Sequence, residues 1–169
     1  MITISIVNQK GGCSKTSTAV NLSSVLAEKG HKTLLIDMDP QGNASSSLGI
    51  DNFNSPTIYE VLHGEIPIDS AVLETGIVNL YMIASNILTA KLEREMSRNS
   101  GSEENLSEDL KPTGLAFDTI IRVSQAIPKA QANKQPVNIY QENSRGSHDY
   151  KCLANEIINK LGKDERRGC

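Results

Sequence analysis

The chain is poor in cysteine and in aromatic residues. Among 169 residues it has three cysteines, two phenylalanines, four tyrosines and no tryptophan. The cysteines form no C-x-x-C pair and have no histidine at metal-ligand spacing, which argues against a disulfide framework or a zinc motif. No apolar run approaches the roughly 18 residues of a membrane-spanning helix, and the N-terminus lacks the basic region and cleavage site of a signal peptide. We therefore expect a cytoplasmic protein with no membrane partner.

Charge is unevenly spread along the chain. Residues 1–110 hold 7 Lys/Arg against 14 Asp/Glu, a net charge of −7, whereas residues 111–169 hold 10 against 6, a net charge of +4. A basic C-terminal part suits contact with the phosphates of DNA, but such runs more often form a solvated surface, and these charges show neither clustering nor interleaved aromatic residues. The charge pattern therefore indicates DNA binding only weakly.

A glycine-containing loop follows the first apolar run. The run Ile2–Val7 is typical of a strand, a helical pattern begins at about residue 15, and between them lies Lys10-Gly11-Gly12-Cys13-Ser14-Lys15-Thr16. A loop between a strand and a helix N-terminus can turn several backbone N–H groups toward an anion, and the helix dipole adds about half a positive charge there. Glycine residues let the backbone approach phosphate oxygens closely because they have no Cβ. The sequence therefore predicts a phosphate-binding loop.

Two side chains of this loop suit a magnesium nucleotide. Lys15 is placed to reach the β- and γ-phosphates, and the Thr16 hydroxyl to ligate Mg²⁺. The match to the pattern G-x-x-x-x-G-K-[ST] is imperfect, because Gln9 and Ser14 stand at its glycine positions. A glycine loop that serves only turn geometry is the alternative. Cys13 has no nearby partner in the sequence that would indicate redox chemistry.

Two carboxylates follow a second apolar run. Leu34-Leu35-Ile36 leads into Asp37-Met38-Asp39-Pro40-Gln41-Gly42-Asn43. Ligands of an open α/β sheet bind at the carboxyl ends of its parallel strands, so we expect Asp37 and Asp39 to lie beside the phosphate loop. Mg²⁺ and an attacking water need carboxylates at that place. The alternative is that Asp39-Pro40 only begins a turn and Asp37 only ends a strand.

With both motifs the sequence resembles the ParA/Soj/MinD group of deviant Walker-A ATPases, whose signatures are K-G-G-x-x-K-[TS] and D-x-D-P-Q-G-N. The resemblance implies binding of ATP with Mg²⁺, ATP-driven dimerisation and weak hydrolysis. These activities would serve chromosome or plasmid partitioning on DNA, together with a ParB-like partner. A P-loop kinase or a relative of the nitrogenase iron protein would share the loop, but the D-P-Q-G-N run favours the ParA type.

The resemblance also implies roles for individual residues. Lys10 would contact the nucleotide of a partner subunit and Asp39 would orient the hydrolytic water, so these two are the expected catalytic residues. Thr16 and Asp37 are the expected metal residues, Asp37 acting through the water shell of the ion. The expected nucleotide site comprises Lys10, Gly11, Gly12, Cys13, Ser14, Lys15, Thr16 and Ser17.

Apolar periodicity predicts alternating strands and helices in the first part of the chain. Helices are expected over residues 15–29, ending before Gly30, over 56–63 with Pro56 at the start, and over 88–96. Strands are expected over residues 2–7, 33–37 and 77–84. This order predicts an α/β fold of P-loop NTPase type, a mostly parallel sheet flanked by helices. His31, His63 and His148 are expected at the surface or in turns.

A polar segment at residues 97–113 interrupts the pattern. Beyond it we expect a strand over 115–122, an extended piece over 135–140 and a helix over 147–161 with one apolar face. The runs F-x-T-x-I-R and S-R-G-x-x-D-Y are similar to the C-terminal end of ParA/Soj proteins, which contributes to the base side of the nucleotide. We therefore expect an ATPase portion over residues 1–98, a polar linker over 99–114 and a C-terminal part over 115–169 that packs on the same domain.

The middle of the family domain is missing from the sequence. No apolar run ends in D-x-P-P, and three βαβ steps correspond to on the order of ninety residues. We interpret the chain as ParA-like with an internal deletion, and expect reduced ATP affinity and very low hydrolysis. Missing strands leave their neighbours unpaired unless residues 115–122 join the first three strands in a smaller sheet. The alternatives are a non-catalytic nucleotide-binding protein that regulates or pairs with an intact relative, and an inactive product.

Overall fold

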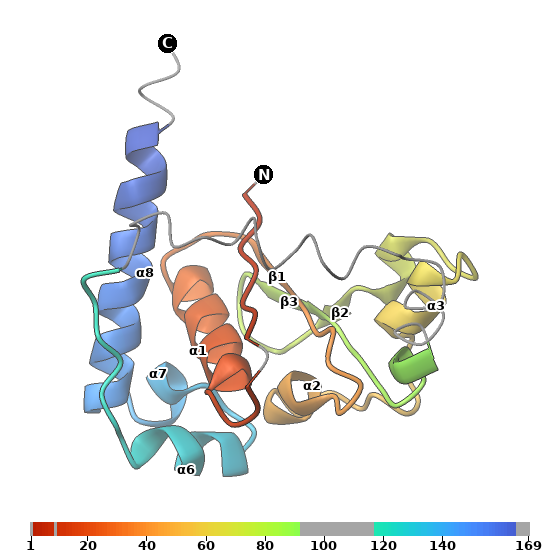
Figure 1. The fold of residues 1–169 in the computed structure, drawn as a ribbon, viewed down its shortest axis with the longest axis horizontal. Helices are drawn as coiled ribbons and strands as arrows, with labels where there is room; N and C mark the ends of the chain where they lie inside the picture. The colour runs from red at the N-terminus through yellow and green to blue at the C-terminus, as the bar shows by residue number, and fades with distance from the viewer. Residues whose placement is uncertain (1, 9, 92–116, 165–169) are drawn as a thin grey trace.

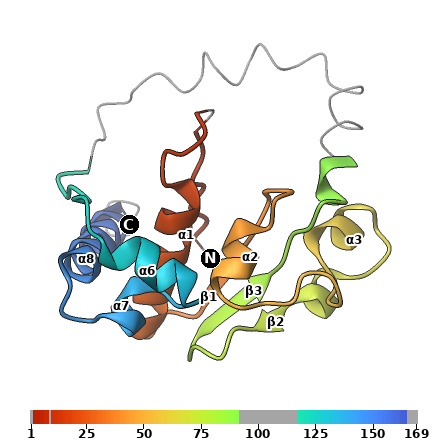
Figure 2. The same cartoon turned by 90° about the horizontal axis from the view of Figure 1, so that it is seen from below.

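Helix α1 (Lys15–Glu28) lies at the centre of the fold. The computed structural model describes residues 2–8, 10–91 and 117–164. Within them, α1 contacts the sheet on one side and helix α8 (Arg145–Asp164) on the other (Figure 1). Seen from below, α6, α7 and α8 lie on one side of α1, and α2, β3 and α3 on the other (Figure 2). The helix thus joins the two halves of the described chain.

The sheet has three strands in the order β1-β3-β2. They are β1 (Thr33–Ile36), β2 (Leu73–Glu74) and β3 (Leu80–Ile83). Strands β1 and β3 pair in parallel, with Thr33 opposite Leu80, and confirm the strands expected over 33–37 and 77–84. Strand β2 pairs antiparallel with β3, because a connection of only a few residues is too short for a parallel crossover. The α/β fold with flanking helices is confirmed, and its small sheet is mixed.

The strand expected over residues 2–7 does not form. Residues 2–8 have no regular secondary structure, and Ile2, Ile4 and Val7 are exposed, while Ile6 packs against a core cluster. A strand needs a partner within hydrogen-bonding distance, and among the described residues β1 pairs only with β3. The apolar pattern carried no information on whether a neighbouring strand was present.

The prediction of a strand over residues 115–122 is also wrong, and this segment does not join the sheet. Residues 115 and 116 lie outside the described ranges, and residues 117–122 have no regular secondary structure. Two carboxylates of α8 hold this segment instead. Glu156 accepts hydrogen bonds from the backbone N–H groups of Asp118 and Thr119 at 2.8 and 2.9 Å, and Asp149 accepts one from the N–H of Arg122 at 2.9 Å. Carboxylates of α8 thus accept the hydrogen bonds that a neighbouring strand would otherwise accept from these N–H groups.

The first part of the chain forms helices close to those expected. Helix α1 ends at Glu28, just before Gly30, and α2 (Asn43–Ser47) and the 3-10 helix η1 (Ile68–Ala71) add two short turns. Helix α3 (Ile58–Leu62) confirms the short helix, but its N-cap is Thr57 rather than Pro56. Thr57 and Glu60 form a reciprocal capping box, which satisfies two backbone N–H groups. Residues 89–91 are helical; the rest of the helix expected over 88–96, and the linker over 99–114, lie outside the described residues.

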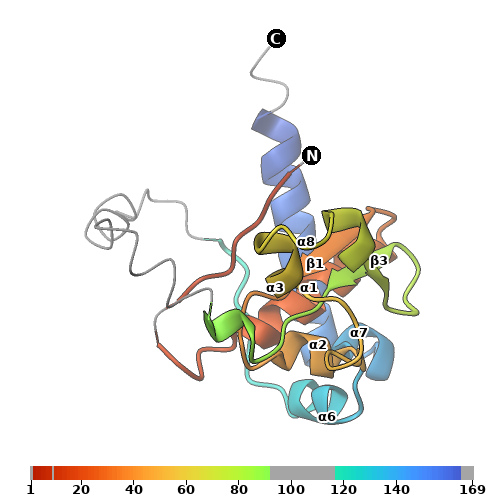
Figure 3. The ribbon, with the colours of Figure 1, turned by 90° about the vertical axis from the view of Figure 1, so that its right-hand side faces the viewer.

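The C-terminal part is more helical than expected. Helix α8 confirms the helix over 147–161 and extends it at both ends, and the C-terminal end of the helix projects beyond the other helices and strands (Figure 3). Helix α6 (Ala126–Ala132) was not expected. The prediction of an extended segment over 135–140 is wrong, because helix α7 (Val137–Tyr140) follows Pro136. A short apolar run fits a strand and a buried helix equally well, and burial of this run against α1 decided between them.

Three apolar clusters stabilise these contacts. The largest joins α1 to α6, α7 and α8, with Val25, Val137 and Ala154 fully buried. The second joins α1 to α2 and β3, and the third joins α3 and η1 to β3. The three histidines are exposed, as expected. In the described ranges, no helix is long and apolar enough to cross a membrane.

Asp149 links stability to pH. Its side chain is buried, and hydrogen bonds from the Arg122 guanidinium hold the pKa of its carboxyl at about 2. An unfolded aspartate has a pKa of about 3.9, so the unfolded chain binds the proton first as pH falls. The stability from this carboxyl is therefore fully present above about pH 4 and is lost between pH 4 and 2.

We expect Asp149→Asn to lower the free energy of unfolding at pH 7 by on the order of 1–2 kcal/mol, since Arg122 is half-exposed. The variant should then lose less stability than the wild type between pH 5 and 2. Urea denaturation followed by circular dichroism measures both quantities. Glu65→Gln, at an exposed carboxylate after α3, is the control and should follow the wild-type profile. Parallel pH profiles for Asp149→Asn and the wild type would contradict this account.

Candidate functional site

The loop before α1 presents unpaired backbone donors. Gly12 and Ser14 have φ angles of +71° and +62°, and Ser14 precedes the helix without capping it through its side chain. Among the described residues, the N–H groups of Lys15, Thr16 and Ser17 have no hydrogen-bond partner, since the first helical bond is donated by the N–H of Thr18. Three free donors at the positive end of a 14-residue helix are the arrangement to which an anion can bind, so this loop is the candidate phosphate site.

Lys15 lies folded over this loop. Its ammonium nitrogen is 3.4 Å from the carbonyl oxygen of Lys10, to which it donates, and 4.0 Å from the Cys13 sulfur. The Cys13 thiol donates to the same carbonyl at 2.9 Å. The Lys10 side chain is exposed, and its backbone N–H donates to Asn8 at 2.9 Å. The positive charge of Lys15 is thus held within the loop, against a neutral carbonyl group.

The acidic turn after β1 is held by α2. Asp37 is 5% exposed, and its Oδ2 accepts hydrogen bonds from the backbone N–H and the hydroxyl of Ser45 at 3.0 and 2.9 Å. Its Oδ1 accepts from the N–H of Asp39 at 3.2 Å. Asp39 is exposed and accepts from the N–H of Gln41 at 2.9 Å, as a turn-forming aspartate does. Asp37 is therefore buried and anchored, whereas Asp39 faces solvent.

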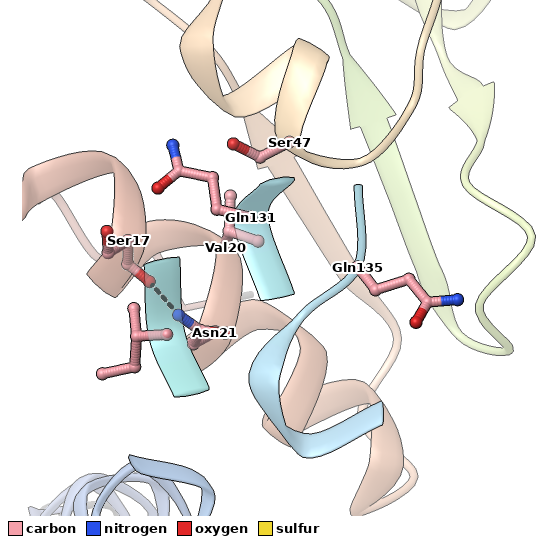
Figure 4. Close-up of a pocket in the computed structure, with 7 residues that line it drawn as sticks. Ser17, Val20, Asn21, Ser47, Gln131 and Gln135 are labelled. Carbon is pink, nitrogen blue, oxygen red and sulfur yellow. Dashed lines mark hydrogen bonds between the residues drawn. The ribbon is translucent and has the colours of Figure 1, made fainter. Parts of the chain in front are cut away.

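Helices α2 and α6 flank the first two turns of α1. A pocket of about 10 Å³ lies between them, lined by Ser17, Val20, Asn21, Ser47, Ile127, Gln131 and Gln135 (Figure 4). The Asn21 amide donates to the Ser17 carbonyl one turn earlier in α1, and its Oδ1 reaches α7, where it accepts from the N–H of Val137 at 2.7 Å. The pocket has room for about one water molecule, so the elements around the start of α1 are closely packed.

The structure places the expected site residues in two neighbouring groups. The residues expected to bind nucleotide form one continuous loop and helix start, while Asp37 and Asp39 lie in the turn between β1 and α2, and α2 contacts α1. No hydrogen bond joins Thr16 to Asp37 in the part of the chain that is described. The described residues also contain no group of three or more His, Cys, Asp or Glu side chains that could hold a metal ion.

These residues still fit a magnesium nucleotide. Mg²⁺ bound with a nucleotide usually takes only one or two protein ligands and completes its shell with water and phosphate. Asp37 is a buried carboxylate, and no lysine or arginine in the described ranges pairs with it. The Thr16 hydroxyl and the Asp37 carboxylate, which has no cationic partner among the described residues, are donors of the type that Mg²⁺ prefers.

Sequence reasoning missed the residues behind the acidic turn. Ser45, Ser85 and Asn52 are all buried, and they connect the turn to the end of β3. The N–H of Ser85 donates to the Ser45 hydroxyl at 3.1 Å, and Asn52 donates to the Ser85 carbonyl at 2.7 Å. Ser45 follows the D-x-D-P-Q-G-N run by two positions, so its place could have been noticed. Ser85 and Asn52 carry no signal in the sequence, because only folding brings them to this turn.

The fold and the loop define an α/β protein of P-loop NTPase type. A family model described as an AAA domain matches residues 1–125. The chain belongs to this AAA-domain family, within the ParA/Soj/MinD group. The resemblance based on the two sequence motifs is therefore confirmed.

Two curated relatives show this similarity. The chromosome partitioning protein ParA of Myxococcus xanthus is 41% identical over 119 residues, covering 70% of this chain and 42% of that protein. The sporulation initiation inhibitor protein Soj of Bacillus subtilis is 38% identical over 119 residues, covering 70% and 47%. The chain thus spans less than half the length of these relatives.

Two solved structures are also similar. The septum site-determining protein MinD of Pyrococcus horikoshii, complexed with Mg-ADP, has a TM-score of 0.72 at 20% identity, covering 92% of this chain and 95% of that chain. This likeness confirms the fold. Cobyrinic acid a,c-diamide synthase of Mycobacterium smegmatis, with a bound ATP analog and magnesium, has a TM-score of 0.52 at 35% identity, covering 62% and 42%.

Gly42 of the acidic turn has no room for a side chain. Its φ is +60°, and a Cβ there would lie 2.4 Å from Nδ2 of Asn52 and 2.7 Å from the Ser85 carbonyl oxygen. Gly49 has a similar φ of +74°, but its nearest neighbour, Lys134, would be 3.7 Å away. Alanine substitutions at Gly42 and Gly49 therefore allow the cost of steric overlap to be measured apart from the cost of backbone strain.

We expect Gly49→Ala to cost about 1–2 kcal/mol of unfolding free energy, from backbone strain alone. Gly42→Ala should cost about 1–3 kcal/mol more, because the neighbouring backbone and amide must also move. Urea denaturation of the two variants measures the difference. Equal losses would show that the turn is not closely packed against Asn52 and Ser85.

Proposed function

We propose that this chain binds ATP with Mg²⁺ at the loop before α1, as a ParA/Soj-type protein of chromosome or plasmid partitioning. The main support is the start of α1, where three N–H groups are unpaired and the Lys15 ammonium lies 3.4 Å from the Lys10 carbonyl oxygen of the preceding loop. Family membership and the similarity to a synthase with a bound ATP analog and magnesium support the same ligand. The role would place the protein in the cytoplasm, where chromosomes and plasmids lie.

Each residue of the two motifs has a part in this proposal. Lys15 leaves the Lys10 carbonyl, a weak partner, for the phosphates, which bind an ammonium far more strongly. Thr16 and Asp37 would hold the magnesium, Asp37 through water, and Asp39 would orient the hydrolytic water from its exposed position. The exposed side chain of Lys10 would reach the nucleotide of a second subunit. We assign these functions to an ATPase portion over residues 1–98 and a C-terminal part over 115–169, joined by a linker over 99–114.

A second candidate is a nucleotide-binding protein without turnover that pairs with an intact relative. The lack of a D-x-P-P run supports it, as does the absence of residues 2–8 and 117–122 from the sheet. The first candidate keeps weak ATP hydrolysis, whereas the second has lost it. A ParB-like protein and DNA are the proposed partners of the first. Lys129 and Arg145, which line an open groove of about 410 Å³ between α6 and α8, offer positive charge to DNA.

Binding of ATP depends on Lys15 in this proposal. We expect Lys15→Ala to weaken ATP binding at least tenfold, because hydrogen bonds to a charged group contribute about 1.5–3 kcal/mol. Isothermal titration calorimetry with and without Mg²⁺ measures the affinity. Lys32→Ala, an exposed lysine in the loop after α1, is the control and should bind as the wild type does. Absence of any binding heat with the wild type would refute the proposed ligand.

Turnover distinguishes the two candidates. For the partitioning ATPase we expect slow phosphate release that rises on addition of DNA and disappears in Asp39→Ala. Phosphate release by purified protein, at several protein concentrations, measures the rate. A rate that Asp39→Ala and Lys15→Ala leave unchanged would exclude the ATPase. Binding without any release would favour the non-catalytic candidate.

A further inference from the structure

The Ser45 hydroxyl joins two parts of the chain that are distant in sequence. It donates to Oδ2 of Asp37 at 2.9 Å and accepts from the backbone N–H of Ser85 at 3.1 Å. Ser45 and Ser85 are fully buried, and Ser85 follows the end of β3. Hydrogen bonds that follow one another in this direction strengthen each other in a buried setting.

This arrangement fixes one oxygen of Asp37 and leaves acceptor capacity on the other. Oδ2 takes both Ser45 donors, whereas Oδ1 accepts only the N–H of Asp39, at 3.2 Å, among the described residues. Each carboxylate oxygen can accept about two hydrogen bonds, so Oδ1 can still accept one from a metal-bound water. The Ser45 contacts thus determine that Oδ1 is the Asp37 oxygen that can accept a further hydrogen bond, and they fix the orientation of the carboxylate.

We infer that Ser45 is a positioning residue for the magnesium complex: it orients Asp37, and the Ser85 N–H orients the Ser45 hydroxyl. The inference rests on the proposed binding of ATP with Mg²⁺ and adds a residue to that site. Ser45 touches neither the nucleotide nor the ion in this account. Groups that hydrogen-bond a metal-linked carboxylate typically contribute 10–100-fold to metal affinity.

A purely structural role for Ser45 predicts a different result. In that case loss of the hydroxyl would destabilise the turn and weaken nucleotide binding equally with and without Mg²⁺. In the positioning role, ATP without the metal binds through the loop before α1, so its affinity changes little. The ratio of the two affinities separates the roles.

The experiment compares ATP affinity in Mg²⁺ and in EDTA for the full chain and two variants, by calorimetry. Ser45→Ala removes the hydroxyl that reaches Asp37. Ser85→Ala is the matched control, since it removes a buried hydroxyl that donates to Thr89 at 3.0 Å but keeps the N–H that reaches Ser45. Mg²⁺ raises the affinity of the wild type for ATP, and we expect Ser45→Ala to reduce the ratio of the affinities in Mg²⁺ and in EDTA about tenfold. Its ATP affinity in EDTA should stay within about twofold of the wild type. Ser85→Ala should keep the full strengthening.

Three results would overturn the inference: an unchanged magnesium effect in Ser45→Ala, an equal loss with and without the metal, or the same loss in Ser85→Ala. Circular dichroism checks that each variant folds. If Ser45→Ala does not fold, Ser45→Cys replaces it, because a thiol keeps a side chain of the same connectivity, though a larger one, and hydrogen-bonds only weakly. A wild type that binds no ATP in either buffer refutes the proposed function, and the inference with it, before any substitution is made.

Discussion

Burial of α1 on two sides is the constraint on which the rest of the structure depends. The sheet and α2 cover one side of this helix, and α7 and α8 cover the other. Even polar residues of α1 are buried, and Asn21 uses its side chain to bind the N–H of Val137 across the contact. A buried helix cannot easily shift along its axis, because its side chains are packed against both neighbours. The position of its N-terminus, and of the three free N–H groups there, is fixed as a result.

The acidic turn is fixed by polar contacts rather than by apolar ones. Asp37, Ser45 and Ser85 form a buried chain of hydrogen bonds, and Gly42 lies against Asn52 and the Ser85 carbonyl with no room for a side chain. A buried carboxylate is costly unless its oxygens are hydrogen-bonded, so this network must be nearly complete to be stable. The turn that carries Asp39 therefore depends on Ser45 and on Ser85, which follows Ser45 by forty positions in the sequence.

The sequence predicted the elements with strong local signals and failed where a partner decided the outcome. The helical periodicity before Gly30 and the single apolar face over 147–161 were sufficient for α1 and α8. The runs at 2–7 and 117–122 have the composition of strands, but whether they pair depends on neighbours that the described chain does not place beside them. Residues 135–140 form α7 because Pro136 and contact with α1 favoured a helix over an equally apolar extended piece.

The candidate site divides in the same way. The candidate phosphate loop, Lys15, Thr16 and the two aspartates could be proposed from the sequence, because backbone approach, positive charge and metal ligation each need particular residue types at short spacing. Only the tertiary structure decided that Asp37 is buried and bound to Ser45 while Asp39 is exposed, and that Ser85 and Asn52 support the turn. Short-range chemistry is written in local sequence, whereas the orientation of a buried carboxylate depends on donors that folding brings from distant parts of the chain.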